Sequence, residues 1–88
     1  MSLSQIRYFI AVAEEGHVGR AAQCLRVAQP AISRQIKHLE DELGTRLFVR
    51  TPRGMQLSPS GAVFLDHARG IVAGVEHATR AVRTTATS

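Results

Sequence analysis

The residues best suited to chemistry in this sequence carry amide, hydroxyl, guanidinium or ammonium groups and lie between residues 20 and 53. A glutamine amide pairs with adenine through two hydrogen bonds, arginine pairs with guanine or phosphate, and serine hydrogen-bonds either kind of partner. Side chains of these types on one surface suit recognition of double-stranded DNA. The set consists of Arg20, Gln29, Ser33, Arg34, Lys37, Arg50 and Arg53.

The distribution of charge agrees with an anionic partner. The 88-residue chain contains 11 Lys and Arg against 7 Asp and Glu, which gives a formal charge of +4. Seven of the cations lie in two stretches, residues 16–39 and 43–65, that contain no acid. These stretches predict a positive surface. A basic face that contacts only solvent is the alternative, and the elements that carry the cations must decide between the two.

Length and composition exclude several classes of protein. The 88 residues, 44% hydrophobic and 20% charged, suit one small globular domain. The single cysteine, Cys24, cannot close an internal disulfide, and we expect it to be a small buried hydrophobe rather than a redox sensor. No apolar run is long enough to span a membrane and no secretory signal is present, so we expect a cytoplasmic protein.

Catalysis, cofactor binding and metal binding are not expected. The sequence has no paired carboxylates suited to a cleft, no nucleophile with an evident base, and no glycine-rich phosphate loop. Its four histidines lack the spacing of a metal site and have no neighbouring cysteine. We therefore expect a protein that is not an enzyme.

Two short helices are predicted ahead of most of the polar set. The first is predicted to begin at a capping box formed by Ser2 and Gln5, with its apolar stripe starting at Leu3, and to end at Gly16. The second covers residues 18–25, where the small Ala21 and Ala22 allow another helix to approach closely. A tight helix-turn-helix corner requires such an approach.

A third helix is predicted over residues 29–43, with the amide, hydroxyl and guanidinium groups near its start. Pro30 is tolerated because it lies in the first turn, and Gly44 ends the helix. The acidic run of residues 40–42 comes only in the last turn, so the polar end of the helix can approach DNA without repulsion. Its predicted core stripe is Ile32, Ile36, Leu39 and Leu43.

Two short strands and a long helix complete the chain. Residues 46–50 and 55–57 predict strands around a turn at residues 51–54, and we call this hairpin the wing. The last helix is predicted over residues 59–83, about 37 Å at 1.5 Å per residue, with residues 84–88 as a flexible end. A small core cannot cover so long a helix, so its coiled-coil seam is expected to need a partner. The seam consists of Phe64, Ala68, Ile71, Val75, Ala78 and Val82.

Several short motifs occur in a recognisable order along this framework. They are Arg20-Ala21-Ala22, Gln29-Pro30-Ala31-Ile32-Ser33-Arg34, Leu39-Glu40, Leu43-Gly44, Leu47-Phe48, Arg53-Gly54 and Leu57-Ser58. In this order and spacing, residues 2 to about 83 resemble the N-terminal domain of bacterial LysR-type transcriptional regulators. The resemblance implies a mainly α fold, in which a winged helix-turn-helix of three helices plus a two-stranded β wing is followed by a long dimerising linker helix.

The resemblance also implies a division of the chain and its partners. Residues 1–57 correspond to the DNA-binding domain, with the helix-turn-helix at about 18–37 and the wing at about 46–57, and residues 58–83 to the linker helix. The implied complex is a homodimer with antiparallel linker helices on an inverted-repeat operator. The effector-binding domain of the family, with its inducer site and its tetramer contacts, is absent from these residues. The implied location is the bacterial nucleoid.

By resemblance, specific residues receive roles on DNA. Gln29, Pro30, Ser33 and Arg34 match recognition-helix positions near bases and backbone, which would lie in the major groove. Arg50 and Arg53 match wing positions near phosphates or the minor groove. For Lys37 and Arg20, phosphate contact and an ordinary surface location are both open.

Three positions depart from the family pattern. Ala28 and Gly19 stand where the family usually has a hydroxyl residue, and His17 replaces another frequent serine. Each missing hydroxyl removes a possible helix cap or phosphate donor, and a lost cap typically costs about 1 kcal/mol. We expect His17 to be a solvated loop residue, although its ring offers a donor. Two alternative functions stay open: a coiled-coil protein-interaction module, and a winged-helix regulator of another family.

Overall fold

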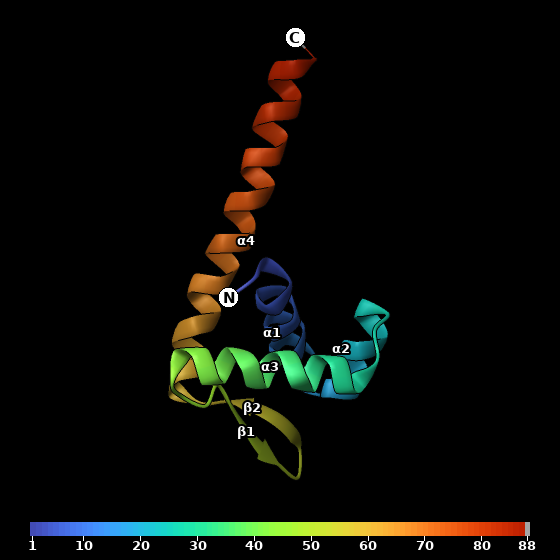
Figure 1. Ribbon diagram of the computed structural model, residues 1–88, viewed down its shortest axis with the longest axis vertical. Coiled ribbons are helices and arrows are strands. Elements are labelled where there is room, and N and C mark those ends of the chain that lie inside the picture. Colours follow the sequence, from blue (N-terminus) through green and yellow to red (C-terminus); the bar gives the residue numbers. More distant parts are fainter. Residues whose placement is uncertain (88) are drawn as a thin grey trace.

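The fold consists of three short helices, a two-stranded wing and one long helix (Figure 1). The computed structural model describes residues 1–87. The elements are α1 (Leu3–Glu15), α2 (Val18–Leu25), α3 (Gln29–Leu43), β1 (Phe48–Thr51), β2 (Gly54–Leu57) and α4 (Pro59–Ala86). The strands are antiparallel, with Phe48 opposite Leu57 and Thr51 opposite Gly54. The predicted mainly α winged helix-turn-helix with a long final helix is confirmed.

The ends of α1 follow the local signals in the sequence. The backbone N–H of Gln5 donates to Oγ of Ser2 at 3.1 Å, and the Gln5 side chain accepts from the Ser2 N–H at 3.2 Å. At the other end, Gly16 adopts a left-handed conformation with φ of +70° and donates to the Val12 carbonyl. The capping box and the glycine stop are therefore confirmed.

One apolar core joins the helices, the wing and the base of α4. Phe9 of α1 is fully buried, and its ring centroid lies 5.2 Å from that of Phe48 and 4.9 Å from that of Phe64. These three aromatic rings connect α1, β1 and α4, so the wing and the long helix are fixed relative to α1. The buried cluster contains Ile6, Phe9, Val12, Val18, Ala21, Ala22, Ile32, Ile36, Leu39, Leu47, Phe48 and Ala68.

The C-terminal end of α3 differs from the prediction in two respects. Leu43, expected in the core stripe, is 38% exposed, because the helix has passed beyond the packed cluster at its last turn. Glu40, for which the sequence predicted only a place in the last turn of the helix, accepts hydrogen bonds through Oε2 from the N–H groups of Leu47 at 2.7 Å and Phe48 at 3.4 Å. The first strand begins at Phe48, directly after Leu47, rather than at Arg46.

The base of α4 packs closely on the chain that leads into the wing. Ser58 caps the helix by accepting from the Gly61 N–H at 2.9 Å, and its hydroxyl donates to the Arg46 carbonyl at 2.7 Å. A Cβ on Gly61 would overlap the carbonyl oxygen of Leu47. Glycine at this position therefore permits a helix and a loop to approach more closely than any side chain would allow.

The distal half of α4 projects away from the body of the domain (Figure 1). The helix contains 28 residues, about 42 Å at 1.5 Å per residue, and continues to Ala86. The helix thus extends three residues beyond its predicted end at residue 83, and Ser88, part of the predicted flexible end, lies outside the described residues. Threonine hydroxyls bond back to the helix here, for example from Thr85 to the Ala81 carbonyl at 3.0 Å. Within residues 1–87, no helix combines the length and apolarity needed to cross a membrane.

Candidate nucleic-acid interface

The corner between α2 and α3 has the form of a helix-turn-helix. Ala21 is fully buried and Ala22 nearly so, which lets the helices pack closely. Helix α2 ends at Arg26, which adopts a left-handed conformation with φ of +57°. The Arg26 N–H donates to the Gln23 carbonyl, and the Val27 N–H donates to the Ala22 carbonyl. The short turn therefore supplies hydrogen-bond partners for carbonyl groups in the last turn of α2. After this turn, α3 crosses the domain with the polar side chains of its first turns exposed to solvent.

The start of α3 presents polar side chains to solvent. Ala28 occupies the N-cap position and makes no side-chain cap bond, as its lack of a hydroxyl predicts. Pro30 lies in the first turn, where its missing N–H costs no intrahelical bond. The side chains expected on the DNA-facing surface of this helix are all exposed: Gln29, Pro30, Ser33, Arg34 and Lys37.

The wing is held against the loop between α1 and α2. The N–H of Met55 donates to the Gly16 carbonyl at 3.0 Å, and a Cβ on Gly54 would overlap that oxygen. At the tip, the Thr51 hydroxyl donates to the Gly54 carbonyl at 3.1 Å and accepts from the Arg53 N–H at 3.2 Å. These contacts fix the tip of the wing and therefore the origin of its two arginine side chains.

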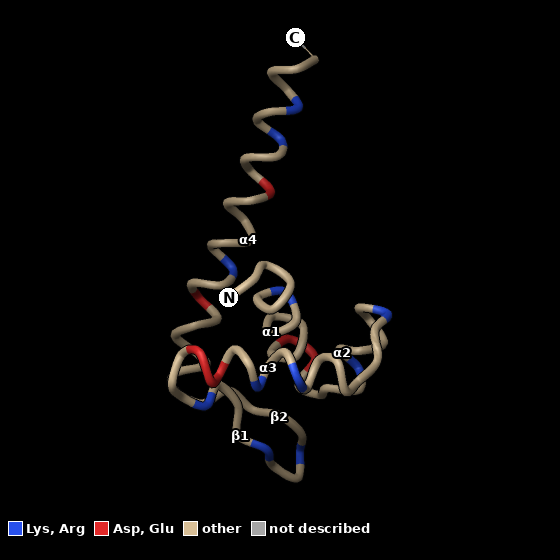
Figure 2. Tube along the Cα trace, viewed as in Figure 1, with Lys and Arg blue, Asp and Glu red and all other residues tan. Residues whose placement is uncertain are grey.

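The predicted DNA-binding cations have no carboxylate partner among residues 1–87, although other arginines do. Arg46 lies 3.6 Å from Glu40, and Arg69 lies 3.7 Å from Glu14. Figure 2 shows basic residues along α3 and at the wing, with acidic residues gathered at the far end of α3. The exposed cations without an ion pair include Arg20, Arg34, Lys37, Arg50 and Arg53. Their charge is therefore free to meet an external anion.

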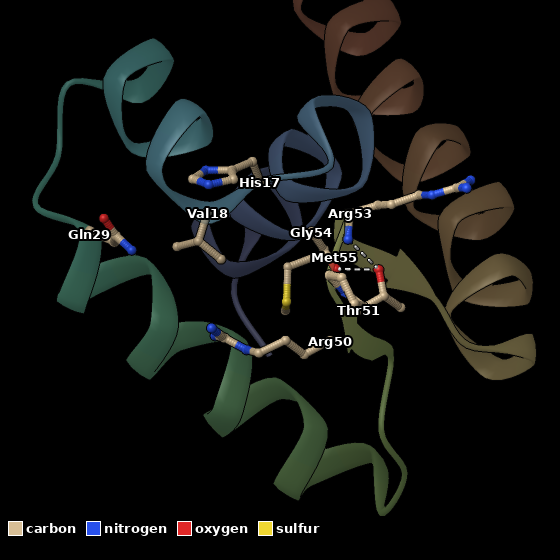
Figure 3. Close-up of a pocket in the computed structure, with 9 residues that line it drawn as sticks. His17, Val18, Gln29, Arg50, Thr51, Arg53, Gly54 and Met55 are labelled. Carbon is tan, nitrogen blue, oxygen red and sulfur yellow. Dashed lines mark hydrogen bonds between the residues drawn. The ribbon is translucent and has the colours of Figure 1, made fainter.

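A cleft separates the starts of α2 and α3 from the wing (Figure 3). In the close-up, Arg50 reaches from the wing toward α3, whereas the Arg53 side chain leaves the opposite side of the hairpin. The structure thus brings Gln29 and Arg50 to the same cleft and places the Arg53 guanidinium away from it. The lining residues are His17, Val18, Gln29, Arg50, Thr51, Pro52, Arg53, Gly54 and Met55.

Two residues have environments that the sequence interpretation missed. His17, expected to be a solvated loop residue, is the N-cap of α2, and its Nδ1 accepts from the Gly19 N–H at 3.1 Å. A signal was present, since His17 comes directly before an apolar helix that lacks a hydroxyl cap. Cys24, expected to be buried, is exposed because Ala21, Ala22 and Leu25 supply the inward stripe of α2.

The predicted seam on α4 divides into two parts. The Phe64 ring packs edge-to-face against Phe9 and Ala68 is fully buried, so these two positions pack inside the chain rather than in an exposed seam. Farther along, Ile71 is 43% and Val75 38% exposed. Ala78 and Val82 are exposed as well. This distal part of the seam is exposed to solvent, because α4 has left the body of the domain.

The described residues contain no cluster of three or more His, Cys, Asp or Glu side chains arranged to hold a metal ion. The cleft beside α3 has no acid in its lining. This lining suits an anionic partner.

Comparison with known proteins gives a consistent result. Residues 3–62 match the model of the bacterial regulatory helix-turn-helix proteins of the lysR family. The chain is 48% identical over 80 residues to the HTH-type transcriptional regulator TfdT of Cupriavidus pinatubonensis, which covers 91% of this chain and 35% of TfdT. The chain therefore spans about a third of the length of that relative, whose name describes a regulator and not an enzyme.

Two solved structures match almost the whole chain. The crystal structure of the CbnR_DBD-DNA complex matches with a TM-score of 0.92 and 42% identity, covering 98% of this chain and 99% of that one. The crystal structure of the BenM_DBD/catB site 1 DNA complex matches with a TM-score of 0.96 and 38% identity, covering 100% and 99%. These matches exclude a winged-helix protein of another family. The helix-turn-helix, the wing and the long helix thus agree with the sequence match, and this chain belongs to the lysR family of bacterial regulatory helix-turn-helix proteins.

Proposed function

We propose that this chain binds DNA sequence-specifically, as a dimer on an inverted repeat. The observation that carries the proposal is the surface formed by α3 and the wing, on which exposed guanidinium, ammonium, amide and hydroxyl groups have no acidic partner. Both solved relatives described above are DNA complexes of chains with the same length and fold. A positive surface around a projecting helix is the arrangement that reads a major groove.

The side chains divide into base-reading and backbone-binding groups. Gln29, Ser33 and Arg34 lie in the first turns of α3, where an inserted helix meets base edges, and we assign them to direct readout together with the adjacent Pro30. Lys37 lies farther along the same helix and Arg20 lies on α2, so we assign both to phosphates. Arg50 and Arg53 extend from the wing to the backbone or the minor groove.

The distal face of α4 supplies the dimer contact in this proposal. Ile71, Val75, Ala78 and Val82 are exposed on a helix that extends beyond its own core. Burying such a seam against a second copy removes apolar surface from water and pairs two recognition helices through a twofold axis. A twofold protein selects a DNA site whose half-sites are inverted relative to each other.

Selection from a random duplex library at near-physiological salt tests this function. Sequencing the retained DNA is expected to give an inverted repeat with a fixed half-site spacing. If each protomer neutralises about four phosphates, the logarithm of the binding constant falls with the logarithm of salt at a slope near −7. Retention without sequence enrichment would refute specific readout and favour a protein-interaction module built on α4.

TfdT is about three times as long as the region that it shares with this chain. We propose that inducer binding and tetramer assembly belong to the further length of such regulators. Transcription regulation in the bacterial cytoplasm, on nucleoid DNA, follows as the role of the complete protein. Within the chain, we propose no cofactor and no catalytic step.

A further inference from the structure

We propose that His17 is an additional DNA-contacting residue, which donates a hydrogen bond from Nε2 to a backbone phosphate, and that Gly19 keeps its ring in position. The inference rests on the DNA-binding function proposed above. It concerns His17 and Gly19, which lie at the start of α2 and are joined by the helix cap.

The helix cap fixes the tautomer of the His17 ring. Nδ1 accepts a hydrogen bond from the Gly19 N–H at 3.1 Å, so this nitrogen carries no hydrogen. A neutral imidazole has one N–H, which must then be on Nε2. Within residues 1–87, His17 makes no further hydrogen bond or ion pair, and its side chain is exposed. One bond to the backbone therefore leaves a donor of known position available to an external acceptor.

The location of the ring indicates which acceptor it meets. His17 lies at the edge of the cleft beside α3, on the same side as Gln29, while Arg50 reaches in from the wing (Figure 3). The cleft thus has donors on opposite edges, with Val18 and Met55 between them and no acidic side chain in the lining. When α3 enters the major groove, the DNA strand beside it presents phosphate oxygens to these edges. A phosphate is an acceptor only and suits both donors.

Gly19 is the residue that leaves room for this arrangement. A Cβ on Gly19 would lie 3.0 Å from Cε1 and 3.1 Å from Nδ1 of the His17 ring, closer than ordinary van der Waals contact. The same Cβ would lie 3.5 Å from Oε1 of Gln29, which is an ordinary contact. A Cβ at this position would therefore require the imidazole to shift by a few tenths of an ångström, while its contact with Gln29 would be ordinary. The position of the His17 ring thus responds to the residue at position 19.

The variant His17→Asn keeps the helix cap of α2 but removes the proposed phosphate donor. Asparagine is a strong N-cap residue, so α2 keeps its cap, but the side chain has no donor at the position of Nε2. The dissociation constant of the whole chain is measured by fluorescence anisotropy on two duplexes, one selected from the library and one of random sequence. We expect the dissociation constant to rise about tenfold for each protomer that contacts the DNA. The factor should be the same on both duplexes, because a phosphate contact does not depend on base sequence. The melting temperature of the protein should not change.

Matched variants complete the test. His77→Asn changes an exposed histidine on the distal half of α4 and is expected to leave affinity unchanged. Gly19→Ala is expected to weaken binding about as much as His17→Asn, and to have no further effect in the His17→Asn background, because the ring it displaces is then absent. The salt slope is expected to stay at the wild-type value in His17→Asn, since a neutral donor releases no counterion.

Different outcomes overturn the inference and the function beneath it. Wild-type affinity in His17→Asn, or additive effects of His17→Asn and Gly19→Ala, refutes the His17 contact alone. A smaller salt slope in His17→Asn refutes the neutral donor, because it indicates a cationic ring in the complex. A wild-type chain that binds neither duplex refutes the proposed DNA-binding function itself.

Discussion

Glu40→Ala is expected to destabilise the domain by about 3 kcal/mol, because this carboxylate anchors the start of the wing. The Glu40 side chain is only 13% exposed. Its Oε2 accepts a short bond from the Leu47 N–H at 2.7 Å and a long one from the Phe48 N–H at 3.4 Å. A hydrogen bond to a charged group contributes about 1.5–3 kcal/mol, and a buried N–H left without a partner costs about 1–3 kcal/mol. The strong bond from the Leu47 N–H and the weak bond from the Phe48 N–H together account for the expected loss of about 3 kcal/mol.

Thermal unfolding followed by circular dichroism, at one fixed protein concentration, measures this loss. A change of about 3 kcal/mol corresponds to a melting temperature lower by roughly 12–24 °C in a domain of this size. Glu40→Gln keeps a neutral acceptor and is expected to lose roughly half as much. The control is Asp41→Asn, an exposed neighbour that should stay within about 0.5 kcal/mol of wild type. If Glu40→Ala also stays within that limit, the carboxylate does not anchor the wing.

Three further substitutions test the recognition helix, the distal seam and the base of α4. Arg34→Ala is expected to lower affinity for the selected duplex by about 1–3 kcal/mol with an unchanged melting temperature, and an equal loss on random-sequence DNA would contradict base contact. Ile71→Asp places a charge in the exposed seam, so sedimentation should show a monomer where wild type and the control Arg80→Ala are dimers. Gly61→Ala is expected to lower the free energy of unfolding by more than about 2 kcal/mol, because the new Cβ would overlap the Leu47 carbonyl oxygen. This loss exceeds the gain of about 1 kcal/mol that alanine gives in a helix relative to glycine. An unchanged free energy of unfolding would contradict the close approach of α4 and the Leu47 backbone.

Much of the fold could be predicted because its signals are local. The capping box at Ser2, the glycine stop at Gly16 and the cap at Ser58 act within a few residues of the helix ends that they define. The turn of the wing is specified in the same way by Pro52 and Gly54. Exposure of the polar residues at the start of α3 also followed from helical periodicity, because the opposite stripe had to be buried.

The interpretation of the long helix shows where periodicity is insufficient. A repeat of apolar residues identifies one face of α4, but it does not say which part of that face meets the chain's own core. Phe64 packs against Phe9 and Ala68 is buried in the core, while Ile71 and Val82 stay exposed. The position of α1 beside α4 decides that division, and it depends on contacts between residues distant in sequence.

The candidate site follows the same distinction between local and long-range information. The sequence by itself determined the helices, the caps at Ser2 and Ser58, the wing and the chemical character of the recognition surface, because these properties depend on neighbouring residues and on side-chain type. The tertiary structure alone decided that Glu40 holds the wing and that Gln29 and Arg50 share a cleft with His17. These relations join separate elements, and their geometry is set by how the apolar core packs those elements together.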